Sequence, residues 1–524
     1  MNFFFRTNFN EKVGLGHLFR CLRLIRYFEK QKHSCYLFTD LLKKKFDFLK
    51  NFNVIPIYKK KVHFFDQKRD IIQFTKATKN FKKGIVIIDD YRIGVDWEKR
   101  ISKFHKKVAV IDDLNKKHYS DYIINYNPSF DLTGNFNYKN VLKKNCKILL
   151  GHKFSFLEKK KKRKKSKNFN VIMYNGSGGD LIFFEKIIKS FLLEKGKLHK
   201  KNVIFKVVIG PFSKNKERIL SFSKKNKQII PILNCYNLND ILFDANLFVG
   251  SAGVSSFETA LNKVPSILFQ VNDNQKVQSE YMEKIGHFII LKLKDLYAYE
   301  KISQLILLAK LQYRRFLYLS KNREFSVDSK GTKRILENIT KRNIGQQIYN
   351  KVNKKLIKNQ YIRKVNDKDI NHYLYSRNLK LNRDHSVTLK KIIPIDHYNW
   401  WFTTKRISHV LIKNNKRILY LYDDKIFSDK RYDYLVPGWF ACHSNCTIRE
   451  ILYALKWQYQ KNMKLNVVNS KKKIMWVSTI RNYNKFSMKL SKYIGFKRLS
   501  EKNSCSKILK KYYNINKGFV YYSR

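Results

Sequence analysis

His17 is the first residue of this sequence whose type and setting could do chemistry. It follows Gly14 and Gly16, shortly after an apolar run at Phe3–Phe5. Glycines let a backbone bend sharply and approach a ligand closely, and a helix that begins there presents free N–H groups to an anion or a polar substrate. Histidine exchanges a proton near neutral pH. A tight turn with a capping histidine explains the same residues equally well, because short glycine motifs are common.

The elements that would position His17 are a strand before it and a helix after it. Apolar residues recur with helical spacing from Leu18 to Phe28, and three later apolar runs are typical of buried parallel strands. These runs are Gly84–Ile88, Val108–Ile111 and Ile123–Ile124, and they end in Asp89-Asp90-Tyr91, Asp112-Asp113 and Asn125. In open α/β sheets, ligands bind beyond the carboxyl ends of the strands. Helix capping explains one polar cluster, but three clusters beside the His17 loop favour a site.

A second strand–loop–helix unit begins after the charge run Lys159–Lys167, which is interpreted as a solvated hinge. Its strand is Val171–Tyr174, and its loop is Asn175–Asp180, with Gly178, Gly179 and Asp180 at the end. This loop resembles a phosphate cradle made from backbone amides. No Gly-Lys-Ser/Thr follows, so it is not a P-loop.

A loop of small residues enters a helix further along the same unit. It contains Gly253, Val254 and Ser255, and Glu258 lies one turn into the helix. Glu258 could accept two hydrogen bonds from a ribose diol, or it could be a first-turn glutamate that the helix dipole favours. Residues 1–155 and 168–345 are therefore predicted to be two Rossmann-like lobes, with glycine loops that face one another.

The composition limits the classes of function. The 524 residues include 109 Lys and Arg against 40 Asp and Glu, which gives a formal net charge of +69. Such a charge invites a nucleic-acid hypothesis. Lysine and asparagine are abundant throughout, however, and no RNA-recognition or zinc-finger signature is present, so we expect no specific nucleic-acid partner.

The cysteines and the apolar runs indicate the cellular compartment of the protein. Seven cysteines are scattered along the chain, and the close pair Cys442 and Cys446 has no second pair to complete a zinc site. The N-terminus lacks the pattern of a signal peptide, and no apolar run is long enough to span a membrane. The sequence therefore predicts a cytoplasmic protein without disulfides.

Six motifs together resemble one family, the hydrolases that act on UDP-2,4-diacetamido-2,4,6-trideoxy-β-L-altropyranose in pseudaminic acid biosynthesis. The matching segments are Gly14–Arg20, Asp89–Tyr91, Asp112-Asp113, Gly178–Asp180, Ser251–Glu258 and Asn274-Gln275. The resemblance covers about the first 340 residues, and it implies a GT-B-type fold, like that of the N-acetylglucosaminyl transferase of peptidoglycan lipid synthesis.

The resemblance also implies a reaction and a set of roles. Water attacks the anomeric carbon and UDP leaves with inversion, without a metal or any other cofactor. The histidine matching His17 is the expected general base. The resemblance places the sugar and the water near Gly16, Arg20, Tyr91, Asn274 and Gln275. It places UDP on two loops and a glutamate, namely Gly178, Gly179, Asp180, Gly253, Val254, Ser255 and Glu258. The Asn175–Asp180 loop departs from the family pattern, which leaves the register of the diphosphate open by about one residue.

The C-terminal part, residues 361–524, has a different pattern. A strand at Ile362–Val365, a helix over Asp367–Ser376 ending at Arg377-Asn378, and a closing Asn484 to Phe496 segment resemble a GNAT-type N-acetyltransferase, an α+β fold that uses acetyl-CoA. That family binds pyrophosphate with a glycine-rich loop, but residues 442–451 contain no glycine, and Ser491 stands where many members have a tyrosine. We therefore expect the fold, with weak or absent acetyl-CoA binding. In the pathway of the resembling hydrolases, acetylation of a 4-amino sugar precedes hydrolysis, so other enzymes of nonulosonic acid synthesis are possible partners.

Three alternatives to the hydrolase remain on the sequence alone. A GT-B glycosyltransferase would use a UDP-sugar donor with an alcohol acceptor instead of water. A dinucleotide enzyme would need G-x-G-x-x-G, but Phe19 occupies the last glycine position. An RNA-binding protein is suggested by charge alone, and it would bind with a steep salt dependence.

Overall fold

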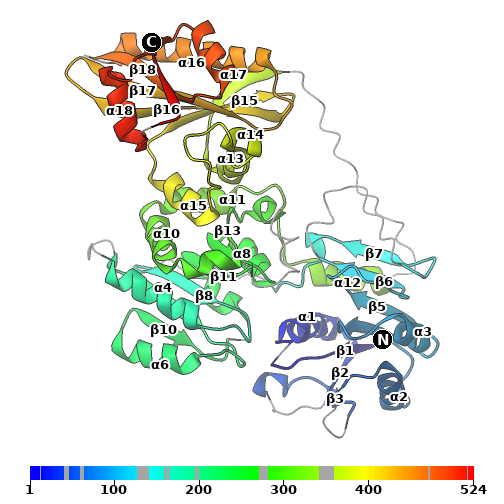
Figure 1. Cartoon of the computed structure of the whole chain (residues 1–524). Coiled ribbons are helices and arrows are strands. Elements are labelled where there is room, and N and C mark those ends of the chain that lie inside the picture. Colours follow the sequence, from blue (N-terminus) through cyan, green and yellow to red (C-terminus); the bar gives the residue numbers. More distant parts are fainter. Residues whose placement is uncertain are drawn as a thin grey trace. The chain divides into compact units, whose positions relative to one another are not determined.

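The computed structural model describes residues 1–11, 13–40, 46–58, 64–126, 141–158, 162, 166–194, 200–235, 237–270, 281–340, 359–469, 472–515 and 517–524. The chain divides into two compact units, Met1–Lys351 and Val352–Arg524 (Figure 1). The first unit contains two parallel sheets, and the second contains one mixed sheet. None of the described helices is both long enough and apolar enough to cross a membrane.

The first lobe is built on a seven-stranded parallel sheet of order β3-β2-β1-β4-β5-β6-β7 (Figure 1, blue to cyan). Its centre is continuously apolar, with Phe4 and Ile87 fully buried, which is what a sheet covered by helices on both faces requires. The elements are β1 (Asn2–Thr7), α1 (Gly16–Lys30), β2 (Ser34–Thr39), η1 (Asp47–Leu49), β3 (Val54–Pro56), α2 (Gln67–Thr78), β4 (Ile85–Asp89), α3 (Val95–Ile101), β5 (Lys107–Ile111), β6 (Tyr122–Asn125), β7 (Lys147–Leu150) and η3 (His152–Phe154).

The second lobe repeats this plan with a six-stranded parallel sheet of order β10-β9-β8-β11-β12-β13. Its first strand, β8, lies centrally between β9 and β11, as β1 lies between β2 and β4. The elements are β8 (Phe169–Tyr174), α4 (Ile182–Leu193), β9 (Val203–Val208), α6 (Lys216–Lys225), β10 (Ile229–Ile232), α7 (Asn239–Leu242), β11 (Leu247–Ser251), α8 (Ser255–Asn262), β12 (Ser266–Phe269), η5 (Glu283–Ile285), β13 (Ile289–Leu291), η6 (Leu293–Tyr297), α10 (Tyr299–Leu311), α11 (Tyr313–Lys321) and α12 (Gly331–Thr340).

Helix α12 returns from the second lobe and packs on the first. Its apolar residues Ile335, Leu336 and Ile339 belong to the same buried cluster as the α1 residues Leu18 and Leu22. The Arg334 guanidinium donates a 2.8 Å hydrogen bond to the Lys153 carbonyl. The two lobes are therefore joined by the segment after β7 and again by α12, so that they form one unit.

The second unit has a sheet of order β14-β15-β16-β17-β18-β20-β19. All neighbours are antiparallel except β17 and β18, which pair in parallel over Tyr432–Leu435 and Lys473–Trp476 and then separate. The elements are β14 (Gln360–Lys364), η7 (Asp367–Asp369), α13 (Ile370–Arg377), α14 (Lys380–Arg383), α15 (Pro394–Thr403), β15 (Ile407–Lys413), β16 (Lys416–Ser428), β17 (Tyr432–Ala441), α16 (Ile448–Asn469), β18 (Lys473–Arg481), α17 (Lys485–Tyr493), β19 (Lys497–Leu499), α18 (Ser504–Tyr513) and β20 (Phe519–Ser523).

Candidate functional site

His17 lies at the start of α1, against the carboxyl end of β4. Gly14 turns the chain into this position with a φ of +78°, a conformation that side chains with a Cβ rarely adopt. A Cβ added to Gly16 would meet nothing within 4 Å, so there is open space beside the first turn of α1. The Nδ1 atom of His17 lies 2.6 Å from Oδ1 of Asp89, which is fully buried.

Arg20, one turn further along α1, joins the carboxylates of two strand ends. Its Nε and Nη2 atoms donate to Asp89 at 2.9 and 2.7 Å, and its Nη1 atom donates to Asp113 at 2.8 Å and to the Tyr126 hydroxyl at 3.0 Å. Burial is the largest single influence and lowers the pKa of the Arg20 guanidinium, but Asp89, Tyr126 and Asp113 together outweigh it and raise that pKa. Arg20 therefore bridges both carboxylates beside His17, and its charge lowers the pKa of Asp113 against the effect of burial.

The hydrogen bonds around His17 define which ring nitrogen is free. Arg20 Nη2 lies 2.8 Å from His17 Nδ1, and both nitrogens contact the same Asp89 oxygen. A guanidinium can only donate, and Asp89 can accept from both nitrogens. We therefore assign the proton of the neutral ring to Nδ1, which leaves the lone pair on Nε2.

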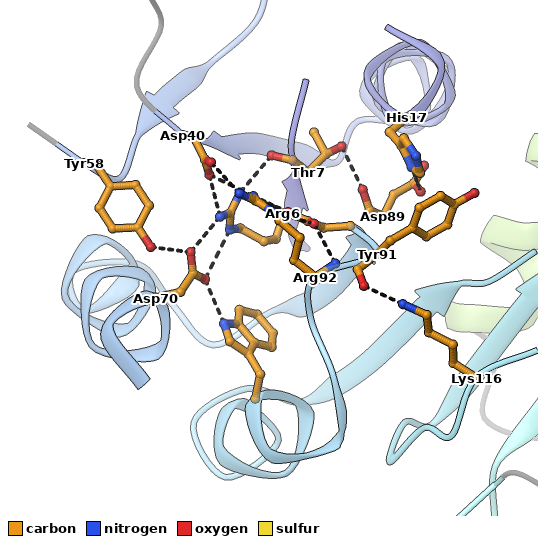
Figure 2. Close-up of polar contacts among 12 residues, drawn as sticks. Arg6, Thr7, His17, Asp40, Tyr58, Asp70, Asp89, Tyr91, Arg92 and Lys116 are labelled. Atoms are coloured by element: carbon orange, nitrogen blue, oxygen red, sulfur yellow. Dashed lines mark hydrogen bonds and ion pairs between the residues drawn. The ribbon is translucent and has the colours of Figure 1, made fainter. Parts of the chain in front are cut away.

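Tyr91 forms one wall of the His17 ring. The two rings meet edge to face, with centroids 4.4 Å apart and an interplanar angle of 87°. The Tyr91 hydroxyl donates to Asp113. The Lys116 ammonium donates a 2.6 Å hydrogen bond to the Tyr91 carbonyl (Figure 2). Burial and the charge of Asp113 raise the pKa of Tyr91, so the phenol stays neutral near pH 7.

Arg6 is the centre of a buried ionic network beside the site (Figure 2). It is fully buried at the end of β1 and donates to Asp70 at 2.6 Å and to Asp40 at 2.7 Å. Asp70 also accepts from the Tyr58 hydroxyl at 2.7 Å and from the Trp97 indole at 2.8 Å. The network satisfies every buried charge it contains, which is the condition under which such charges are tolerated.

A second arginine connects this network to the strand end that carries Asp89. Arg92 donates to Asp40 at 2.9 Å and to Asp90 at 2.7 Å. Thr7, the neighbour of Arg6, donates a 2.9 Å hydrogen bond to the Asp89 carbonyl. Arg6 and Arg92 thus fix the backbone from which Asp89 points at His17.

His118 supports the loop that carries Asp113. Its Nδ1 atom lies 2.7 Å from Glu98, and its Nε2 atom lies 3.4 Å from Asp112. All three side chains are buried. Burial lowers the pKa of His118, but the hydrogen bonds and charges of Asp112 and Glu98 outweigh it and raise the pKa to about 9. His118 is therefore charged near pH 7 and holds two buried carboxylates.

The glycine loop of the second lobe touches the loop of the first. The Leu15 amide donates a 2.8 Å hydrogen bond to the Ser177 hydroxyl. Gly179 packs so closely on its own loop that an added Cβ would lie 2.0 Å from the Asn175 carbonyl oxygen. Asp180 accepts from the Ile182 amide at 2.9 Å and from Asn215 at 2.8 Å, so its carboxylate secures the start of α4.

The small-residue loop leads into α8 as the sequence predicts. Val254 precedes the helix and Ser255 begins it, so their amides are among those that a helix leaves without internal partners. Ser255 donates to the Ser251 carbonyl at 3.2 Å. Glu258 is 4% exposed and forms an ion pair with Arg23 of α1. Burial raises the pKa of Glu258, although the charge of Arg23 opposes this rise.

The predicted residues thus fall into three groups. His17, Arg20 and Tyr91 lie together at the end of the first sheet, with Gly16 beside them. Gly178, Gly179, Asp180, Gly253, Val254, Ser255 and Glu258 lie at or just beyond β8 and β11 of the second. Asn274 and Gln275 lie outside the described residues.

Asp89 and Asp113 belong to the sequence motifs, but the sequence alone assigned them no roles. Arg6, Arg23 and His118 were not predicted to be functional. One signal was present for Arg6, because a charge directly after three phenylalanines interrupts an otherwise apolar strand. A charge in a buried strand needs partners. No periodic pattern distinguishes Arg23 from the other arginines of α1.

The second unit encloses a cavity of about 920 Å³ where β17 and β18 separate. Its lining includes Val436, Gly438 and Phe440 of β17, and Thr479 of β18. Ser491 of α17 also lines the cavity, whereas the neighbouring Tyr493 is 68% exposed and is not part of the lining.

No family model matches the sequence, and no curated protein sequence matches it. Among solved structures, MurG from Acinetobacter baumannii is similar over 64% of this chain and 98% of its own, with 12% identity and a TM-score of 0.43. The UDP-GlcNAc 2-epimerase from Neisseria meningitidis, bound to UDP-GlcNAc, is similar over 65% and 99%, with 11% identity and a TM-score of 0.41.

The N-acetyltransferase from Staphylococcus aureus Mu50 is similar over 32% of this chain and 98% of its own, with 15% identity and a TM-score of 0.25. The predicted fold class is confirmed, because the chain has two Rossmann-like lobes of the GT-B type followed by a GNAT-like α+β domain. This assignment concerns the fold alone.

Proposed function

We propose that the first unit hydrolyses a UDP-linked 2,4-diacetamido-2,4,6-trideoxy sugar by attack of water at the anomeric carbon. The observation that carries the proposal is the His17–Asp89 contact of 2.6 Å at the end of β4, beside the open space at Gly16. A histidine oriented by a buried carboxylate, with its other nitrogen free, is an arrangement suited to a general base. The substrate class follows from the resemblance of the six motifs.

In this proposal, His17 Nε2 takes a proton from water while the water oxygen forms a bond to the anomeric carbon. The bond between that carbon and the phosphate oxygen breaks, and UDP leaves with the electron pair on the opposite face, so the configuration inverts. Asp89 stabilises the imidazolium that forms, because its carboxylate already accepts from Nδ1. Tyr91 packs against the ring and restricts its orientation.

The second lobe provides the groups proposed to bind UDP. The amides near Val254 and Ser255 begin α8, and the N-terminus of a helix favours a diphosphate. The Gly178-Gly179 loop allows close approach of the backbone. Asp180 takes a supporting role in this proposal, since its carboxylate is engaged by Ile182 and Asn215.

The test is incubation of the purified chain with a panel of UDP-sugars, with NMR detection of the released sugar and its anomeric configuration. Release of UDP together with an inverted free sugar supports the hydrolase. Turnover only after addition of an alcohol acceptor, with formation of a glycoside, would instead establish the GT-B glycosyltransferase. His17→Asn is the matched variant, since it removes the base and retains a polar side chain of similar size.

Acetyl transfer by the second unit is a second candidate function, favoured by the cavity between β17 and β18. The segment of residues 442–447 between β17 and α16 contains no glycine, and we still expect it to obstruct a pyrophosphate. Titration with acetyl-CoA, followed by an assay with a 4-amino UDP-sugar, tests this candidate independently of hydrolysis.

A further inference from the structure

Three arginines spaced by three residues along α1 contact three different parts of the first unit. Arg20 binds the carboxylates of the first lobe. Arg23 pairs with Glu258 of the second lobe, and Arg26 donates to Glu158 of the connecting segment at 2.7 Å. The helix that carries His17 therefore reaches the nucleotide side of the proposed site through Arg23.

The contacts of Arg23 hold its guanidinium in one place. Its Nη1 atom donates to the Phe156 carbonyl at 2.9 Å, and its Nη2 atom donates to Oε1 of Glu258. Its side chain is only 9% exposed. The bond to the Phe156 carbonyl orients the planar guanidinium, and the bond to Glu258 then holds Oε1 of that carboxylate in one place.

Glu258 needs such a partner to act as an acceptor. It is buried, and both burial and the nearby Glu158 raise its pKa, whereas Arg23 lowers it. An ionised carboxylate accepts at both oxygens, while a protonated one gains a donor and loses acceptor strength. Within the described residues, no donor contacts Oε2 of Glu258, so this oxygen remains for a ligand.

The place of Glu258 suits the ribose of a nucleotide. It lies four residues beyond Val254, or about 6 Å along the helix axis. A diphosphate at the start of α8 would therefore leave its ribose near Glu258. A vicinal diol presents two O–H donors, which match a carboxylate oxygen that has no protein partner.

We propose that Arg23 is a positioning residue for the nucleotide, which holds the Glu258 carboxylate directed at the ribose hydroxyls from the helix that carries His17. This inference rests on the proposed function, because it takes UDP as the nucleotide of that site. Arg23 contacts the carboxylate and not the nucleotide itself.

The experiment compares UDP with 2′,3′-dideoxyuridine 5′-diphosphate, which lacks both ribose hydroxyls, by calorimetric titration of the full chain. Arg23→Gln should weaken UDP binding by about tenfold or more, as expected for a hydrogen bond to a charged group. It should change binding of the dideoxy nucleotide by less than about twofold. Arg23→Lys should restore part of the UDP affinity, since it keeps the charge but forms fewer bonds.

Arg26→Gln is the matched control, because Arg26 lies on the same helix and bridges to Glu158 without contacting Glu258. Because it breaks no contact of Glu258 and alters only the charge near Glu158, it should change the ratio of the two affinities much less than Arg23→Gln does. Equal losses for both nucleotides in Arg23→Gln, or no loss, would overturn the inference while the hydrolase proposal stands. If Arg23→Gln does not fold, Arg23→Lys takes its place. Equal losses for both nucleotides in that variant, or no loss, would then overturn the inference.

Failure of the proposed function gives a different result. Selective loss of UDP affinity in Arg23→Gln, together with no hydrolysis of any UDP-sugar by the unaltered chain, would support the inference and reject the hydrolase. Absence of UDP binding to the unaltered chain would overturn both.

Discussion

The carboxyl ends of the two parallel sheets carry different kinds of chemical groups. The first presents a histidine with arginine, aspartate and tyrosine side chains bonded to one another. The second presents glycines, small residues and helix amides, with Glu258 as the buried carboxylate at α8. Side chains can exchange protons, whereas backbone amides can hold an anion without changing charge. The same sheet plan thus separates proposed catalysis from proposed binding.

His17→Asn should affect the first sheet's proposed catalytic group and leave the second lobe unchanged. We expect turnover of the UDP-sugar to fall about 100-fold or more, the scale expected when a general base is lost, while UDP affinity stays within about twofold. Steady-state kinetics and UDP titration measure the two effects. Turnover within a few-fold of the unaltered chain would reject the base assignment.

Glu258→Ala tests the proposed nucleotide-binding side, at the carboxyl end of the second sheet. UDP binding should weaken by about 1.5–3 kcal/mol, as for loss of hydrogen bonds to a charged group. Calorimetry at fixed ionic strength measures this loss, and circular dichroism checks that the chain is folded. Unchanged UDP affinity would leave Glu258 as a partner of Arg23 only.

His118→Gln tests whether the charge of His118 stabilises the carboxyl edge of the first sheet. The pKa of His118 is raised from 6.5 to about 9 in the folded chain. Its stabilisation is therefore fully present below about pH 6.5 and is lost as the pH rises through about 9. The difference in unfolding free energy between the two proteins should shrink by about 2 kcal/mol from pH 7 to pH 9.5.

Denaturant unfolding at these two pH values measures that change. A difference that stays constant with pH would show that His118 contributes packing rather than charge. UDP affinity at pH 7 serves as the internal control, since the second lobe should bind the nucleotide as before.

Removal of the second unit should have the smallest effect. A fragment of residues 1–345 should stay folded and keep hydrolysis within about twofold, because α12 ends at Thr340 and closes onto the first lobe. The separate residues 361–524 should bind acetyl-CoA weakly or not at all. Micromolar binding with acetyl transfer to a 4-amino UDP-sugar would contradict this and make the chain bifunctional.

Much of the fold was accessible from the pattern of the sequence. Continuous apolar runs predicted β4, β5 and β6, and the glycine loops predicted where α1 and α4 begin. β17 was missed, because Pro437 and Gly438 interrupt it. A proline is unfavourable in a paired strand, but β17 has already separated from β18 at this point, so the interruption marks the cavity rather than a loop.

Local pattern is enough to single out the groups that could react, because His17, Tyr91 and the glycine loops all follow predicted strands. Their partners depend on tertiary packing, because Asp89 reaches His17 across 72 residues and Glu258 reaches Arg23 across 235. Local spacing reports which face of a helix or strand a residue occupies. The pairing of charges depends on which strand ends meet, and that is set by the packing of whole lobes.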